Sequence, residues 1–430
     1  MLAINAVRRA SAVLRTAAPL STWSAVPAGP PDPILGISEA FKADKDPRKI
    51  NLGVGAYRDE NGKPYVLNAV KKAEAKMAFA KLDKEYLPIT GLANFTQNAA
   101  KLAYGSDSAP LNQNANYLSP TPTWGNHIPL FKDSGLEVRS YRYFDKKTVG
   151  LDFEGLKEDL KVCADFRCVT LPHPLSRTPQ KVLSYFYMPV LHNPTGVDPT
   201  PAQWKELSDI LAEKKLFPFF DMAYQGFASG STTRDAFAVR HFVSQGHNVA
   251  LCQSFAKNMG LYGERVGAFS LTTSSEEEKK RVESQLKIIV RPMYSNPPLH
   301  GAHIANTILS DPELYQEWES EVKGMADRII NMRERLCELF TNGFQTPGSW
   351  GHIESQIGMF RCVAFLGVRS AGCSHAWCSF TGLQTEQCRA LAEKAHIYMT
   401  MDGRISMAGL NSSNIEYFAQ SVDAAVRGNL

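Results

Sequence analysis

The sequence predicts an α/β protein built on a largely parallel sheet, and three local patterns support this fold class. A helix-start pattern, Thr-Pro-Ala-Gln, occupies residues 200–203, where the Thr and Gln side chains can cap the helix and Pro suits its first position. Two apolar runs, residues 216–220 and 249–253, have the length and bulk of buried strands. Helix followed by strand, repeated, is typical of parallel sheets flanked by helices.

A long amphipathic helix leads from this region into a second, C-terminal domain. Asp311 can cap its first turn, Pro312 suits its first position, and apolar residues recur at helical spacing up to Leu336. Asn342-Gly343 favours its termination. We therefore expect a large domain and a smaller α/β domain. The expected divisions are residues 1–29 outside the fold, 30–64 in the small domain, 65–325 in the large domain, and 326–430 in the small domain again.

Composition narrows the class of protein. The chain has 430 residues, a hydrophobic share of 44% and a formal net charge of +4, which are ordinary values for a globular protein of more than one domain. No apolar run approaches the roughly 18 residues of a membrane-spanning helix, and no basic stripe indicates nucleic acid. The spacing of the eight cysteines fits neither a disulfide framework nor a zinc site, so we expect no metal.

The N-terminus has the composition of a mitochondrial targeting segment. Its first 31 residues contain Arg8, Arg9 and Arg15 but no acidic residue, and they lack the long apolar centre of a secretory signal. We therefore expect residues 1–29 to be a presequence that directs the protein to the mitochondrial matrix. A merely unstructured N-terminus is the alternative.

The clearest candidate site lies at the ends of the two predicted strands, where parallel sheets bind ligands. The first strand ends at Asp221, and the second ends at Ser254, shortly before Lys257. A lysine near a buried strand is unusual because burial disfavours its charge, and a neutral lysine is a nucleophile for carbonyl groups. Ser254 and Arg265 can bind a phosphate. Together they indicate an aldehyde-bearing phosphate ligand; a surface lysine in a glycine-rich loop is the alternative.

Three residues could contact the ring of such a ligand. Asp221 can pair with a pyridinium nitrogen and keep it protonated, which makes the ring an electron sink. Tyr224 can donate a hydrogen bond to a phenolic ring oxygen. Asn193, in an Asn-Pro-Thr-Gly turn, can reach the same oxygen. Taken singly, an aspartate at a strand end is more often a helix cap, and the turn is a weak motif.

Two arginines predict the substrate class. Arg291 and Arg404 are separate guanidinium groups, and each can bind one carboxylate through two parallel hydrogen bonds. A pair of them predicts a dicarboxylic substrate. Each arginine singly is more often a surface ion-pair partner.

Jointly, these motifs resemble those of the aspartate aminotransferases, fold-type I enzymes that use pyridoxal 5'-phosphate. The matching stretches begin at residues 29, 51, 83 and 122 and continue through residues 220–230, the Lys257 region, Arg291 and residues 399–406. The resemblance implies a large domain with a mostly parallel sheet, a smaller α/β domain, and a homodimer with shared active sites. The implied reaction converts L-aspartate and 2-oxoglutarate into oxaloacetate and L-glutamate.

The resemblance also implies the site residues. Lys257 binds the cofactor covalently and then moves a proton between substrate and cofactor, and Asp221 and Tyr224 complete the catalytic set. The implied cofactor contacts are Lys257, Asp221, Tyr224, Asn193, Trp124, His127, Ser254, Arg265 and Tyr86. The implied substrate contacts are Arg404 for the α-carboxylate, Arg291 for the distal carboxylate, Gly55, Trp124 and Asn193. In the family, Tyr86 and Arg291 come from the neighbouring subunit.

Three stretches depart from the family pattern. Residues 106–120 lack the Ser-Gly-Thr-Gly turn that binds the cofactor phosphate at a helix N-terminus. Residues 161–191 replace the strand expected before Asn193, and residues 361–379 form an atypical insert. The alternative function is therefore a catalytically impaired or inactive homologue. An enzyme for aromatic substrates is a third reading, which Arg291 disfavours because its charge would be left unpaired.

Overall fold

The structure is a computed structural model of the chain. It describes residues 26–27, 35–106, 116–121, 126–134, 138–145, 148–163, 184–190, 192–193, 195–357, 360–362, 383–401 and 403–430. Trp124, most of the expected presequence, and the greater part of the stretches 106–120 and 361–379 lie outside these residues, so their roles stay predictions.

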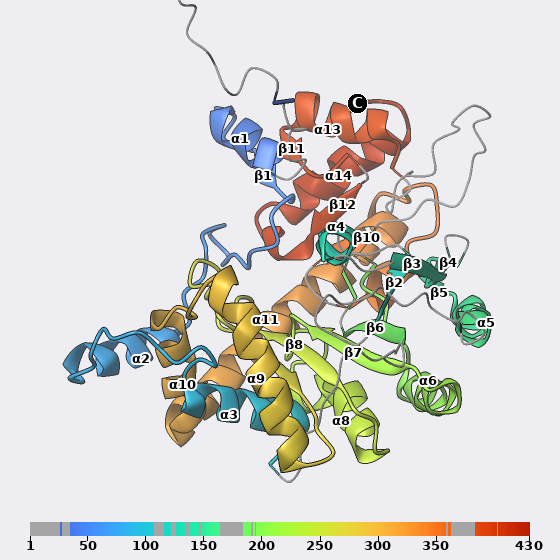
Figure 1. The fold of residues 1–430 in the computed structure, drawn as a ribbon. Coiled ribbons are helices and arrows are strands. Elements are labelled where there is room, and N and C mark those ends of the chain that lie inside the picture. Colours follow the sequence, from blue (N-terminus) through green and yellow to red (C-terminus); the bar gives the residue numbers. More distant parts are fainter. Residues whose placement is uncertain are drawn as a thin grey trace, which may run out of the picture.

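A six-stranded sheet forms the centre of the described chain (Figure 1). Its order is β3-β2-β6-β7-β8-β9, and every neighbouring pair is parallel except β8 and β9. The strands are β2 (Asn116–Thr121), β3 (Val138–Arg142), β6 (Ser184–Val190), β7 (Phe217–Met222), β8 (Ala250–Ser254) and β9 (Gly267–Leu271). A short separate ribbon pairs β4 (Phe144–Asp145) with β5 (Gly150–Leu151). The mostly parallel sheet predicted from the sequence is confirmed.

Strand β6 corrects one prediction. Residues 161–191 were expected to replace the strand before Asn193, and this is wrong for residues 184–190. They form β6, which pairs with β2 on one side and with β7 on the other. The reason lies in the local sequence, Ser-Tyr-Phe-Tyr-Met-Pro-Val, because bulky aromatic and apolar residues favour a strand. Alternate residues Phe186, Met188 and Val190 are buried.

Helices surround this sheet (Figure 1). They are α2 (Asn68–Phe79), α3 (Ala93–Tyr104), α4 (His127–Asp133), α5 (Phe153–Cys163), α6 (Pro201–Lys214), α7 (Thr232–Asp235), α8 (Phe237–Ser244), α9 (Glu276–Met293) and α10 (His300–Ser310). The capping box predicted for α6 is present, with reciprocal hydrogen bonds between Thr200 and Gln203. Trp204 of α6 and Phe242 of α8 pack on Phe220 of β7 at ring-centroid distances of 6.2 and 5.2 Å. These aromatic contacts fix the strand that carries Asp221.

Helix α11 (Pro312–Glu338) is the long helix that the sequence predicted, and a π-helical turn, η1 (Leu339–Gly343), ends it. The Asp311 side chain caps it by accepting hydrogen bonds from the backbone N–H groups of Glu313 and Leu314. Glu321, further along α11, accepts from the backbone N–H groups of Asn68 and Ala69 at 2.7 and 3.0 Å. A carboxylate at this position satisfies otherwise unpaired donors at the start of α2.

Segments from both ends of the chain form a second group of elements at the top of Figure 1. Its elements are α1 (Leu35–Ala43), β1 (Ile50–Asn51), α12 (His352–Ser355), β10 (Phe360–Cys362), α13 (Thr385–Ala395), β11 (Ile397–Tyr398), β12 (Arg404–Ser406), η2 (Met407–Gly409) and α14 (Ile415–Val426). Strand β1 pairs in parallel with β11, and β10 pairs antiparallel with β12. These pairings join the N-terminal segment to the C-terminal one. No helix among the described residues is both long and apolar enough to cross a bilayer.

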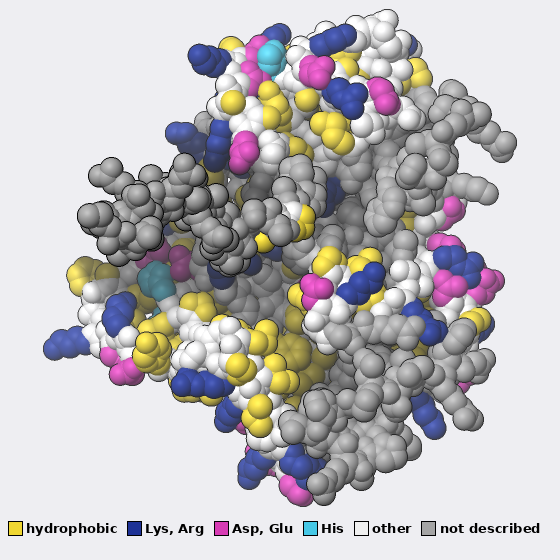
Figure 2. Space-filling view, turned by 45° about the horizontal axis from the view of Figure 1, so that its top comes forward, with side chains coloured by type: hydrophobic (Ala, Val, Ile, Leu, Met, Phe, Trp, Pro, Cys, Tyr) yellow, Lys and Arg dark blue, Asp and Glu magenta, His cyan; other side chains and the backbone are white. Residues whose placement is uncertain are grey.

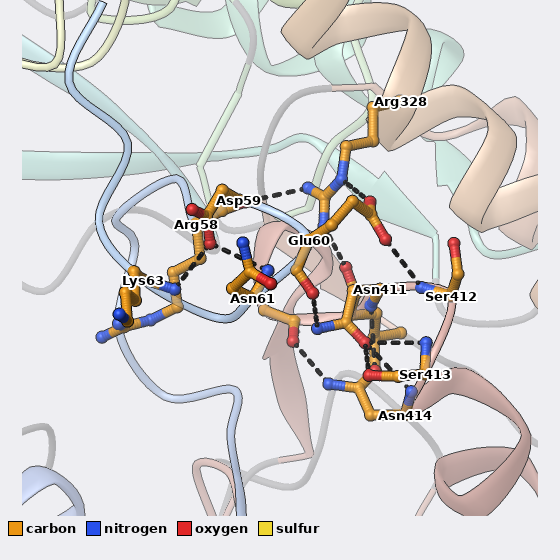
Figure 3. A network of polar contacts seen from close by, with 12 residues as sticks. Arg58, Asp59, Glu60, Asn61, Lys63, Arg328, Asn411, Ser412, Ser413 and Asn414 are labelled. Atoms are coloured by element: carbon orange, nitrogen blue, oxygen red, sulfur yellow. Dashed lines mark hydrogen bonds and ion pairs between the residues drawn. The ribbon is translucent and has the colours of Figure 1, made fainter.

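A polar network holds the loop of residues 58–63 against α11 and the chain after η2 (Figure 3). Arg328 forms an ion pair with Glu60 and donates to the backbone carbonyls of Arg58 and Leu410 at 3.0 and 2.8 Å. Glu60 also accepts from the backbone N–H of Ser412 at 3.1 Å. The network thereby fixes residues 58–63, which come shortly after Gly55 in the chain.

Candidate active site

Asp221 and Lys257 lie at the carboxyl ends of neighbouring parallel strands. Asp221 is in β7 and faces Cys252 of β8 in the strand register, while Ser254 ends β8. Lys257 follows in a tight turn, which a hydrogen bond from the Gly260 N–H to the Lys257 carbonyl closes at 3.0 Å. Gly260 has a φ of +64°, and a Cβ there would meet Leu67 at 3.1 Å, so the turn requires glycine.

Hydrogen bonds between buried amide groups support this turn. The Asn258 side chain donates to the Gln225 carbonyl at 3.1 Å, and the Gln253 side chain donates to the Gln225 side chain at 3.0 Å. Trp318 of α11 donates its indole N–H to the Asn258 carbonyl at 2.8 Å. Because buried polar groups are costly to leave unpaired, these bonds hold the residues around Lys257 in one arrangement.

The environment of Lys257 favours the neutral form of its amine. Burial lowers the pKa of Lys257 from its ordinary value of 10.5, the Asp221 carboxylate opposes this, and the Arg265 guanidinium adds to it. Its Nζ lies 5.2 Å from the centre of the Tyr224 ring. Within the described part of the chain, no hydrogen-bond acceptor contacts this amine. A desolvated lysine beside a second cation is the arrangement that activates lysine toward carbonyl groups.

Asp221 belongs to a three-membered polar cluster. The hydroxyl of Tyr187, in β6, donates to Asp221 Oδ2 at 2.5 Å and lies 2.7 Å from His127 Nε2. His127 Nε2 is 3.3 Å from the same carboxylate oxygen. The structure therefore brings His127, Tyr187 and Asp221 together. Tyr187 was not predicted; a hydroxyl near the end of an aromatic strand, six residues before Asn193, was the available signal.

Arg404 lies close enough to Tyr224 for its charge to act on the phenol. Burial raises the pKa of Tyr224 well above its ordinary range, and the positive charge of Arg404 opposes this shift. Arg404 is in β12, more than 140 residues from Lys257 in the sequence, and pairs in register with Cys362 of β10. The pairing of these short strands thus brings the arginine predicted for the α-carboxylate to the lysine site.

The side chains around Lys257 fit pyridoxal phosphate. Asn193 Oδ1 is buried without a hydrogen-bond partner among the described residues, so a bound group could complete its pairing. Ser254 ends β8, and Arg265, exposed and at a φ of 53°, is close enough to affect the charge of Lys257. An amine, a carboxylate, a buried phenol and a hydroxyl–guanidinium pair match an aldehyde, a ring nitrogen, a ring oxygen and a phosphate.

The segment that contains Gly55 lies beside the lysine turn. The backbone N–H of Tyr57 donates to the hydroxyl of Tyr262 at 2.9 Å, and Arg265 donates to the Tyr262 carbonyl at 3.1 Å. Burial raises the pKa of Tyr262 to about 12, so this hydroxyl stays protonated at neutral pH. The contact connects the segment that contains Gly55 to the loop that carries Lys257 and Arg265.

Tyr86 and Arg291 form a separate site. Both line a cavity of about 810 Å³ whose lining includes none of Asp221, Tyr224 and Lys257. Tyr86 is 83% exposed. Arg291 donates to the Ser295 side chain at 2.6 Å, and Asn296 donates to the Leu87 carbonyl at 2.6 Å. The chain therefore does not bring these two residues to its own Lys257.

Comparison with known proteins identifies what the chain is similar to. The family model for aminotransferase class I and II matches residues 47–117 and 107–422. The chain is 51% identical to the mitochondrial aspartate aminotransferase of Xenopus tropicalis over 94% of this chain and 92% of the relative. It is 49% identical to that of Gallus gallus over 98% of this chain and 97% of the relative.

Solved structures of aminotransferases are also similar to this chain. An aromatic-amino-acid aminotransferase from Burkholderia pseudomallei, covalently bound to pyridoxal phosphate, superposes with a TM-score of 0.82 at 36% identity, over 95% of this chain and 100% of that chain. The cytoplasmic aspartate aminotransferase of Saccharomyces cerevisiae superposes with a TM-score of 0.81 at 35% identity, over 95% and 99% of the two chains.

Proposed function

This chain belongs to the aminotransferase class I and II family, and on that premise we propose that it is a pyridoxal phosphate-dependent aspartate aminotransferase. It transfers the amino group of L-aspartate to 2-oxoglutarate and gives oxaloacetate and L-glutamate. The observation that carries the proposal is the position of Lys257, directly after β8 and beside the strand that carries Asp221, with its amine 5.2 Å from the centre of the Tyr224 ring.

The chain's own residues would hold the cofactor at four points. Lys257 binds its aldehyde carbon, Asp221 its ring nitrogen, and Tyr224 with Asn193 its ring oxygen. Ser254 and Arg265 bind its phosphate. When bound, pyridoxal phosphate carries the amino group between the two oxo acids and serves as an electron sink. His127 supports Asp221, and Trp124 would cover the ring.

Lys257 then has a second task. As a free neutral amine, Lys257 would take the proton from the α carbon of the substrate and donate that proton again later in the reaction. A neutral amine is required for this step, and burial favours that form. The buried Tyr224 phenol stays protonated because its pKa is raised, so it can donate throughout.

Two guanidinium groups define the substrate. Arg404, which lies close enough to Tyr224 to influence its charge, binds the α-carboxylate. Arg291 of the partner subunit binds the distal carboxylate, Tyr86 of the partner subunit reaches the phosphate, and the Gly55 segment closes over the substrate. Dicarboxylic amino acids and 2-oxo acids alone satisfy both arginines.

We propose a homodimer whose interface includes the Tyr86–Arg291 surface. Around Arg291, the side chains of Ile288, Ile289, Met293 and Tyr294 are each more than half exposed. Figure 2 shows hydrophobic side chains gathered at the lower left of the molecule, the side on which Figure 1 has α2 and α9. Exposed apolar surface of this kind is typical of an interface, and a two-fold dimer uses one patch twice.

The same comparison supports a proposal for the cellular location. Curated relatives from a frog, a bird and an amoeba are all named mitochondrial, and residues 1–29 have a targeting composition. We propose that the enzyme acts in the mitochondrial matrix. The domain divisions given above, at residues 30–64, 65–325 and 326–430, accompany this proposal, and the parallel pairing of β1 with β11 supports them.

The alternative of an impaired homologue rests on the missing Ser-Gly-Thr-Gly turn alone. Relatives that match more than nine tenths of the chain favour the active enzyme, and β6 keeps the sheet continuous where a break was expected. We therefore retain the aminotransferase as the proposed function.

The test uses the purified full-length chain. After addition of pyridoxal phosphate we expect visible absorbance from the lysine-bound cofactor, and conversion of aspartate and 2-oxoglutarate in an assay that detects oxaloacetate. Lys257→Ala should abolish the absorbance band and lower the rate by at least about 10⁴-fold. Absence of both signals in the wild-type protein would refute the proposal.

A further inference from the structure

Among the described residues, Tyr187 makes the shortest contact with the Asp221 carboxylate. Its hydroxyl oxygen is 2.5 Å from Asp221 Oδ2, and its side chain is buried. A carboxylate can only accept, so the hydroxyl proton points to Asp221. An O–H···O⁻ bond of this length belongs to the strong, charge-assisted class.

The position of this one proton also determines the role of His127. Since the Tyr187 hydroxyl donates to Asp221, its oxygen must accept at 2.7 Å from His127 Nε2, which therefore carries a hydrogen. His127 and Tyr187 both approach the same carboxylate oxygen, Oδ2. Among the described residues, no donor contacts Oδ1. The arrangement leaves that oxygen to accept a hydrogen bond from a bound ring nitrogen.

Packing fixes the Tyr187 ring in the orientation that this bond needs. Its ring centre lies 4.7 Å from that of His127, 5.8 Å from Phe219 and 6.2 Å from Phe131. Tyr187 pairs in register with Phe219 of β7, and the Tyr141 hydroxyl donates to the Tyr187 carbonyl at 2.8 Å. Both the backbone and the ring are thus held before any ligand binds, as preorganised sites require.

We infer that Tyr187 is a positioning residue for the reaction: its hydroxyl orients Asp221 through Oδ2, so that Oδ1 meets the ring nitrogen of pyridoxal phosphate. The inference rests on the proposed function and adds a residue from the stretch 161–191, where the chain departs from the family pattern. Tyr187 acts through Asp221 and touches neither substrate nor the reacting carbon.

Tyr187→Phe tests the inference because it removes the hydroxyl and keeps the ring contacts. The dissociation constant of pyridoxal phosphate, measured from the absorbance of the lysine-bound cofactor, should rise about tenfold, since the lost bond is to a charged group. The kcat for aspartate should fall about tenfold, while KM stays within about twofold, because both substrate carboxylates bind elsewhere.

Two further variants separate positioning from general destabilisation. Tyr104→Phe removes another buried hydroxyl, which contacts Ser270 at 2.7 Å, and should leave cofactor affinity within about twofold. In an Asp221→Ala background, adding Tyr187→Phe should change the dissociation constant by less than about twofold, because the residue through which Tyr187 acts is gone.

The outcomes distinguish the inference from the function on which it rests. Wild-type protein that shows no absorbance with pyridoxal phosphate contradicts both. If the wild type binds the cofactor and Tyr187→Phe binds it equally well, the inference alone is overturned. The inference also fails if Tyr187→Phe weakens binding equally with and without Asp221, because that result indicates a structural effect.

Discussion

Two regions of this molecule carry the predicted site residues, and they differ in how complete they are. Around Lys257, residues from β6, β7, β8 and β12 converge, and the amine is buried enough for its pKa to fall. Around Arg291, the arginine and Tyr86 stand at the surface, in a cavity bordered by exposed apolar side chains. Each region is held internally by hydrogen bonds such as Trp318 to Asn258 and Asn296 to Leu87.

The difference shows which part of the site one chain can assemble alone. In the Lys257 region, one chain supplies a desolvated amine, the Asp221 carboxylate and the Tyr187 donor. The Arg291 guanidinium donates to the Ser295 hydroxyl within the cavity lining, and that lining contains none of Asp221, Tyr224 and Lys257. In the proposed shared site, Arg291 binds substrate only when the Lys257 region of the partner subunit is brought next to it.

The largest expected effect is in the Lys257 region. Asp221→Ala leaves the cofactor's ring nitrogen without its carboxylate, and truncating one member of a buried charge pair costs about 2–5 kcal/mol. We expect kcat/KM for aspartate to fall about 10³-fold, measured by oxaloacetate production. Asp209→Ala, which changes an exposed aspartate of α6, is the matched control and should stay within about twofold.

Arg291→Ala should have a smaller and more selective effect. Loss of a two-pronged hydrogen bond to a charged group should lower kcat/KM for aspartate about 10²-fold, while the rate with phenylalanine stays within about threefold. Arg281→Ala, on the same helix and paired with Glu277, should change neither rate. Equal losses on both amino acids would mean that Arg291 does not bind the distal carboxylate.

A mixing experiment tests whether the two regions meet across subunits. Lys257→Ala and Arg291→Ala are each impaired alone. When they are unfolded together and refolded as a 1:1 mixture, half of the dimers are mixed, and each mixed dimer has one site with both residues intact. Activity on aspartate should recover to about one quarter of wild type. If both residues served the site of their own chain, mixing would restore nothing.

The sequence predicted the Lys257 region well because its key residues follow strand ends. Asp221 and Ser254 lie near the carboxyl ends of β7 and β8, which are consecutive in the sheet and pair directly, and the rule that such ends lie at one edge of a sheet can be applied to a sequence. The role of Arg404 could be predicted only from the resemblance to the family, because no local sequence pattern indicates that β12 lies near Tyr224.

Other features depended on contacts that a single sequence does not reveal. Tyr187 meets Asp221 because β6 pairs with β7 across an interval of about 30 residues, and the strand itself was expected to be missing. The separation of Tyr86 and Arg291 from Lys257 is likewise a matter of tertiary arrangement. The sequence motifs identified which residues have reactive or ligand-binding side chains. The tertiary packing determines which of these residues lie in one site.

The smallest expected effect is a pH-dependent stability difference in the cofactor-free protein. Burial lowers the pKa of Lys257 below its ordinary value of 10.5, so between the lowered value and 10.5 the unfolded chain binds more protons than the folded one. The stability of the wild-type apoprotein should therefore rise with pH across this window. Lys257→Met removes the titrating group and keeps the length of the side chain.

Urea unfolding of the two apoproteins measures this difference. Lys257→Met should be the more stable near pH 8, because it has no charge to desolvate, and its advantage should shrink as the pH approaches 10.5. Lys280→Met, which changes an exposed lysine of α9, should show a difference that does not vary with pH. An advantage of Lys257→Met that grows with pH would mean that Lys257 is stabilised in its charged form. The folded protein would then favour the charged form of Lys257, and a charged amine does not react with an aldehyde.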